Sequence, residues 1–138
     1  MTEETIDALV KKFYTHTLPK AEWTHEAHLT VAYWYLRRYS VEEATCYLRS
    51  GIITYNVSIG IENSAFRGYH ETLTLFWIHI IHKHIQLNGS ENGSEGLLNF
   101  LNSVQASKKY PLTFYSREVL FSLPARAFWT EPNLLPLP

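Results

Sequence analysis

Apolar side chains recur along this chain at the spacing of helices, and polar turns separate the runs. The longest apolar run, 73–81, is broken only by Thr74 and His79. Within the stretch 67–87, apolar residues fill one helical face, and further isoleucines widen that face until little remains for solvent. The pattern predicts a central helix there, with polar chemistry confined to its first turn.

Other segments carry the same helical period. The expected helices are 3–14 with Thr2 as N-cap, 25–38 with Thr24 as N-cap, 40–56 with a capping box of Ser40 and Glu43, and a fifth helix capped by Ser94. The polar repeat 88–94 that precedes the fifth helix is rich in turn residues and is expected to be mobile. No segment alternates in the way that a strand requires.

The end of the chain shows a shorter pattern. Segments 116–121 and 124–129 are long enough only for single turns or short helices, and the tail 130–138 contains three prolines. We expect that tail to be extended and to lie over the bundle through Leu134, Leu135 and Leu137. The sequence therefore predicts an all-α fold, an up-down bundle of about five helices with short C-terminal helical turns and an extended proline-rich tail, in one domain spanning 1–138.

Composition narrows the class of protein. The 138 residues are 46% apolar and 18% charged, too hydrophobic for a disordered chain, and no apolar run approaches the roughly 20 residues of a membrane span. The net charge of −1 and the scattered basic residues exclude a nucleic-acid-binding protein. An acidic N-terminus without an apolar signal core, and a single cysteine, predict a cytoplasmic protein. We expect that cysteine, Cys46, to be a small buried apolar residue rather than a nucleophile.

Two polar motifs are candidates for a site. The first is Trp23-Thr24-His25-Glu26-Ala27-His28, in which the two histidines are three residues apart and so lie on one side of a helix. The second is His70-Glu71, at the start of the predicted central helix. If the first four helices alternate up and down, the second and fourth run parallel, and the two motifs meet at one end of the bundle.

Three imidazoles and a carboxylate at one point are a suitable ligand set for zinc, iron or manganese. The residues of this hypothetical metal site are His25, His28 and His70 as ligands, with Glu71 as a further ligand or general base. Trp23 and Tyr69 flank the two motifs and are candidates for pocket walls, together with Glu62 in the loop 57–67. The alternative is structural: the histidines cap helices or lie on the surface, and His70 and Glu71 form a hydrogen-bonded pair that joins helices.

Three stretches of this chain form a recognisable set: W-T-H-E-A-H-L at 23–29, Y-H-E-T-L-T at 69–74, and the run from Y-S-R-E-V-L-F-S to A-R-A-F-W-T-E-P-N-L-L-P-L at 115–137. In these stretches the chain resembles a family of small all-helical bacterial proteins that has no established activity. The resemblance implies that both histidine motifs and the C-terminal strip belong to one unit, and it makes Arg126 a candidate member of the shared site.

Two functional hypotheses follow. In the first, the protein is a metal-dependent enzyme that acts on a small molecule, with Glu71 as its catalytic residue. In the second, it is a non-catalytic ligand-binding or interaction protein, and the same residues form a buried hydrogen-bond network. Geometry distinguishes them, because metal ligation needs free imidazole nitrogens about 2.0–2.2 Å from one point, whereas a network bonds each histidine to a backbone carbonyl or a carboxylate.

Overall fold

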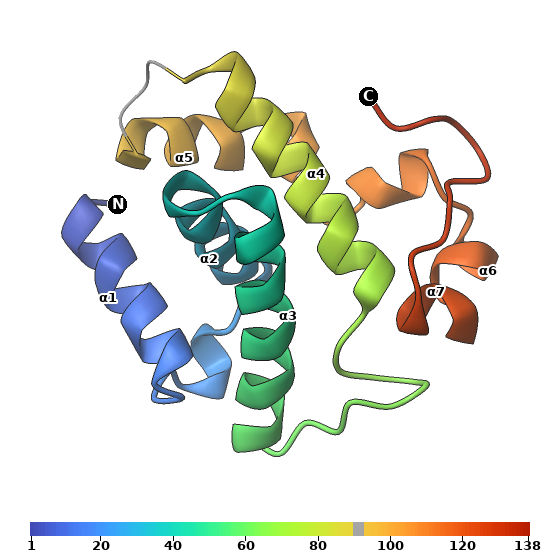
Figure 1. The fold of residues 1–138 in the computed structure, drawn as a ribbon, viewed down its shortest axis with the longest axis horizontal. Coiled ribbons are helices and arrows are strands. Elements are labelled where there is room, and N and C mark those ends of the chain that lie inside the picture. The colour runs from blue at the N-terminus through green and yellow to red at the C-terminus, as the bar shows by residue number, and fades with distance from the viewer. Residues whose placement is uncertain (90–92) are drawn as a thin grey trace.

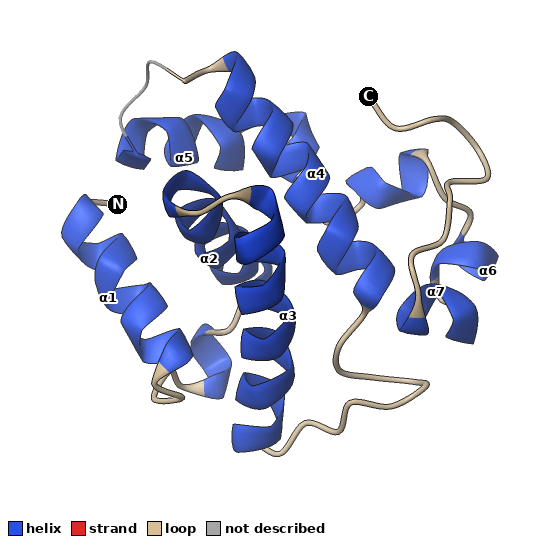
Figure 2. Ribbon diagram, viewed as in Figure 1, coloured by secondary structure: helices blue, strands red, loops and turns tan. Residues whose placement is uncertain are grey.

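The computed structural model describes residues 1–89 and 93–138, and this part of the chain contains seven α-helices and no strand. The predicted all-α class is confirmed, and Figure 2 shows the loops and turns that join the helices. The helices are α1 (Glu3–Tyr14), α2 (His25–Arg38), α3 (Val41–Ser58), α4 (Glu71–Leu87), α5 (Gly93–Leu101), α6 (Arg117–Leu120) and α7 (Leu123–Ala127). Single 3-10 turns lie at Lys20–Glu22, Val104–Ala106 and Tyr110–Thr113.

Side-chain caps begin the first three helices where the sequence predicted them. The hydroxyl groups of Thr2, Thr24 and Ser40 each accept a hydrogen bond from the backbone N–H three residues further along. Each cap satisfies a backbone donor that the first turn of a helix otherwise leaves unpaired. Helices α1 and α2 have the predicted bounds, and α3 continues to Ser58, two residues beyond the prediction.

The fifth helix differs from its prediction. Helix α5 begins at Gly93, so Ser94 lies inside its first turn and is not its cap. The turn-rich repeat 88–94, which the sequence predicts to be mobile, falls partly on residues 90–92, outside the described residues.

The first four helices alternate in direction, as Figure 1 shows: α1 and α3 run one way, and α2 and α4 run the other. Helix α5 packs against α1, α2 and α4 and closes the end of the bundle where α4 finishes. Helices α6 and α7 lie on the side of α4 that is turned away from α1. Because α2 and α4 run in the same direction, their N-termini lie at the same end of the bundle.

Helix α2 is the most buried helix, although the longest apolar run lies in α4. In α2 the continuous stretch 29–33 is buried, and the helix packs against α1, α3, α4 and α5. In α4 the residues buried between 72 and 81 alternate with partly buried ones such as Leu73, Leu75 and Trp77. Helix α4 nevertheless packs against four helices, α2, α3, α5 and α7, so it is central as predicted and shares that position with the more buried α2.

One buried hydroxyl group of α4 bonds three backbone groups of the C-terminal segment. The Oγ1 atom of Thr72 lies 2.6 Å from the carbonyl oxygen of Ala125 and 2.8 Å from that of Phe128, and it accepts the N–H of Thr130 at 3.1 Å. Thr72 is completely buried. One threonine therefore fixes both α7 and the chain that follows it against α4.

Two sequence-based expectations about exposure need correction. Cys46 is exposed, because it lies on the outer face of α3 rather than on the face that carries Ala44 and Leu48 into the core. In the tail, Leu134 and Leu135 are exposed and only Leu137 packs against the core. Among the residues that the structure describes, no helix has both the length and the apolar character to cross a membrane.

Candidate functional site

A cavity of about 610 Å³ lies between α2, α3, α4 and the segments 61–70 and 108–121. Its wall is mostly apolar and includes Leu29, Ile52, Leu73, Trp77 and Leu120. The first turns of α2 and α4 bring His25, His28 and His70 to this wall. Parallel helices therefore place both motifs at one end of the bundle, as the sequence predicts.

His70 uses both of its ring nitrogens to hold the fold. As the N-cap of α4, its Nδ1 accepts the N–H of Leu73 at 3.1 Å. The ring proton is therefore on Nε2, which donates to the carbonyl oxygen of Leu120 at 2.7 Å. Burial, followed by the positive charge of Arg126, lowers the pKa of His70, so the ring is neutral near pH 7. Neither nitrogen retains a lone pair for a metal.

His25 and His28 each bond a backbone carbonyl through one nitrogen. The Nε2 atom of His25 lies 2.8 Å from the oxygen of Ala106, and the Nδ1 atom of His28 lies 2.7 Å from the oxygen of Thr24. A carbonyl oxygen can only accept, so each of these nitrogens carries the proton. In a neutral ring this leaves Nδ1 of His25 and Nε2 of His28 as hydrogen-bond acceptors, and neither bonds another residue in the described part of the chain.

The ring of His28 is held in an apolar position. It stacks on the indole of Trp23, with the ring centroids 3.7 Å apart. Burial lowers the pKa of His28 from 6.5 to about 4, and the hydrogen bond to Thr24 only partly opposes this shift. The charges of His25 and Lys108 lower the pKa further. His28 is therefore an uncharged acceptor at neutral pH.

This hydrogen bonding favours the structural alternative over the three-histidine metal site. Each histidine bonds a backbone carbonyl, which is the arrangement expected of a network. Within 1–89 and 93–138, no group of three or more His, Cys, Asp or Glu side chains could hold a metal ion. A metal at this wall would have at most His25 and His28 as ligands, beside the positive charge of Lys108. Binding of zinc, iron or manganese stays a prediction from the sequence.

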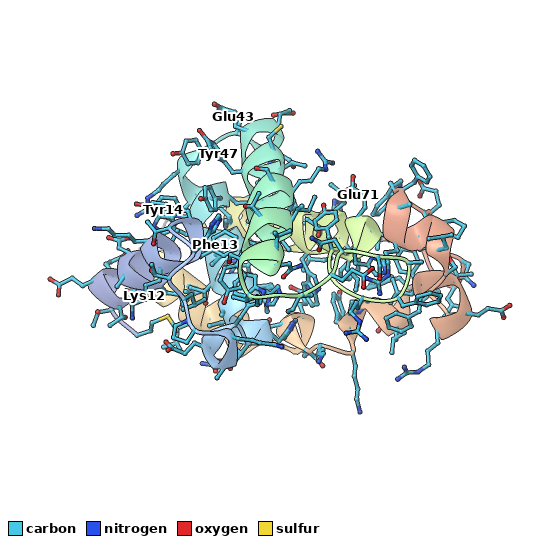
Figure 3. The ribbon with its side chains drawn as sticks, turned by 90° about the horizontal axis from the view of Figure 1, so that it is seen from below. Lys12, Phe13, Tyr14, Glu43, Tyr47 and Glu71 are labelled. Atoms are coloured by element: carbon cyan, nitrogen blue, oxygen red, sulfur yellow. The ribbon has the colours of Figure 1, made fainter. Side chains whose placement is uncertain are left out.

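Glu71 is occupied by an ion pair rather than free to act as a base. Both of its oxygens accept from the guanidinium of Arg49, at 3.0 and 2.7 Å, and one also accepts the Tyr69 hydroxyl at 2.5 Å. Arg49 is the main reason that the pKa of Glu71 is lowered, so the carboxylate stays ionised. Figure 3 shows Glu71 at the start of α4, near α3. The pair joins these two helices, and the catalytic role of Glu71 stays a prediction that the geometry does not favour.

The predicted pocket residues divide into two groups. Trp23 and Tyr69 line the cavity, as expected, whereas Glu62 is exposed and does not. Arg126 lies behind the wall, where its Nη1 donates to the carbonyl oxygens of Gly68 and Tyr69 at 3.2 Å each. It braces the loop that leads into α4, so it supports the site from outside.

Sequence reasoning missed Arg49 and Lys108. Arg49 lies on α3 and meets Glu71 only after α3 and α4 pack. Lys108 follows α5 and reaches the wall because the chain returns beside α2, where Ala106 accepts the hydrogen bond from His25. No local pattern marks either residue, since each acquires its partner across a long separation in sequence.

The neutral state of His28 predicts that acid weakens the fold. The unfolded chain binds a proton near pH 6.5 and the folded chain only near pH 4, so stability is complete above pH 6.5 and falls as the pH drops towards 4. The expected loss from this residue is at most about 3 kcal/mol. Urea unfolding measured from pH 7 to pH 4 should show the free energy of unfolding decreasing as the pH falls. This decrease should be smaller in His28→Gln. His79→Gln, at an exposed position of α4, controls for loss of an imidazole. If stability depended on pH with equal slopes in the wild type and both variants, the lowered pKa of His28 would be contradicted.

Comparisons of this chain with protein-family models, curated proteins and solved structures found no match. The resemblance of the three motifs to a bacterial family stays a prediction.

Proposed function

We propose that this protein binds a small, mainly apolar molecule in the cavity between α2, α3 and α4. The observation that carries the proposal is a mostly apolar cavity of about 610 Å³ with imidazole acceptors on its wall. Binding sites for small molecules have this character: an apolar enclosure that supplies affinity and a few polar groups that orient the ligand. His25 and His28 supply those groups here, through their unbonded ring nitrogens.

Binding without metal-dependent catalysis accounts best for the polar residues around the cavity. His70 maintains the start of α4, and Glu71 pairs with Arg49. Both residues thus support the walls, and Glu71, the predicted base, is occupied by its partners. A metal-dependent enzyme of the kind that the sequence suggests would need His70 and Glu71 to be free of these partners.

A neutral fluorescent probe tests the proposal directly. N-phenyl-1-naphthylamine fluoresces weakly in water and strongly in an apolar site, and it carries one N–H donor for an imidazole nitrogen. Titration into the purified protein is expected to give a saturable rise in fluorescence at one probe per chain. A rise that does not saturate would show surface adsorption and would contradict a built site.

A variant that narrows the cavity should weaken this binding. Leu73 lines the cavity, and Leu75 lies on the same helix, is buried to a similar degree, and does not line it. Leu73→Trp is expected to weaken probe binding about tenfold, because the larger ring takes up part of the space that the probe needs. Leu75→Trp, with circular dichroism and thermal unfolding recorded for both variants, controls for a general effect of a new tryptophan. Equal affinities in the two variants would place the probe elsewhere and overturn the proposal.

A further inference from the structure

The cavity wall has an unbalanced charge. Of the described residues that line it, none is Asp, Glu or Arg, and one is a lysine, Lys108. The remaining polar groups include imidazoles, indoles and hydroxyls. An apolar wall whose only formal charge is positive attracts an anionic group and opposes a cationic one, because no carboxylate is present to offset a second positive charge.

Lys108 stands at the rim of this wall. Its side chain is exposed, yet it lines the same cavity as His25 and His28. Its charge is close enough to His28 to contribute to the lowered pKa of that ring. The ion pairs between side chains in the described part of the chain are Arg38 with Asp7 and Arg49 with Glu71, so the Lys108 ammonium forms none there. Its charge is available to a ligand.

We infer that the ligand of the proposed binding site is an apolar monocarboxylate, with its ring or chain enclosed by the cavity and its carboxylate at Lys108. The inference rests on the proposed function, because it assigns the chemistry of a ligand in the same cavity. A carboxylate at the rim remains partly hydrated while it accepts a charge-assisted hydrogen bond, so the pair avoids most of the desolvation that weakens a fully buried ion pair. An N–H or O–H on the enclosed body donates to His25 or His28.

A series of ligands that differ only in charge tests the inference. Indole-3-acetate, indole-3-acetamide and tryptamine share one ring and one ring N–H, and at pH 7 they are anionic, neutral and cationic. Each is titrated against protein loaded with N-phenyl-1-naphthylamine. Indole-3-acetate is expected to displace the probe at about a tenfold lower concentration than the acetamide. Tryptamine should be the weakest of the three.

Two adjacent lysines provide a matched pair of variants. Lys108→Met removes the charge at the rim, and Lys109→Met removes an equally exposed charge that does not line the cavity. The preference for acetate over acetamide should fall to about one in Lys108→Met and persist in Lys109→Met. Equal displacement by the acetate and the acetamide in the wild-type protein would overturn the inference, and so would an undiminished preference in Lys108→Met. Either result leaves the proposed function intact as long as the wild-type protein binds the probe saturably. Failure of the wild-type protein to bind the probe would refute the proposed function itself.

Discussion

Replacement of His70 by alanine is expected to lower the free energy of unfolding by about 3 kcal/mol. The variant loses the N-cap of α4, which is worth about 1 kcal/mol. It also leaves the buried carbonyl of Leu120 without its donor, at a cost of about 1–3 kcal/mol. Urea unfolding at pH 7 measures the sum. His70 is 7% exposed, so water cannot fully replace the lost contacts.

His70→Asn separates the two roles of the imidazole. The asparagine side chain caps helices well, so its oxygen can still accept the N–H of Leu73, but it is too short to reach Leu120. We expect a loss of stability between those of the wild type and of His70→Ala. Metal analysis of protein prepared without a tag or chelator accompanies the measurement. Near-stoichiometric zinc, iron or manganese that disappears in His70→Ala would contradict the structural role and support the metal site.

The second large effect is expected at Thr72. Valine has nearly the same shape as threonine, so Thr72→Val removes mainly the hydroxyl and its hydrogen bonds. The backbone groups of Ala125, Phe128 and Thr130 lose their common partner. Leaving such groups unpaired should cost roughly 2 kcal/mol and loosen the segment that follows α6. Hydrogen exchange should accelerate from α7 to the C-terminus more than in α1 or α2.

Thr30→Val is the matched control for this experiment. Thr30 is as deeply buried as Thr72, but its hydroxyl donates to the carbonyl of Glu26 within the same helix. That carbonyl keeps its helical hydrogen bond after substitution, so the expected loss is below about 1 kcal/mol. Equal losses in the two valine variants, or exchange that quickens uniformly along the chain, would show that Thr72 does not anchor the C-terminal segment.

The helices were predictable because their signals are local. Apolar spacing and the caps Thr2, Thr24 and Ser40 involve residues within one or two turns, and the structure places these three caps as predicted. Degree of burial was less predictable. Cys46 and the partly buried face of α4 show that an apolar or small residue becomes buried only when another element covers it.

The candidate site shows the same division. The sequence by itself determined which helices form, and with the up-down order it determined that the histidines of α2 and α4 meet at one cavity. Only the tertiary structure decided what those residues do there. The carbonyl oxygens of Leu120 and Ala106 accept hydrogen bonds from the rings of His70 and His25. Arg49 pairs with the carboxylate of Glu71, and Lys108 places a positive charge at the rim of the cavity. A side chain's free lone pair or charge depends on partners that packing supplies from distant segments, and the residue type alone does not specify them.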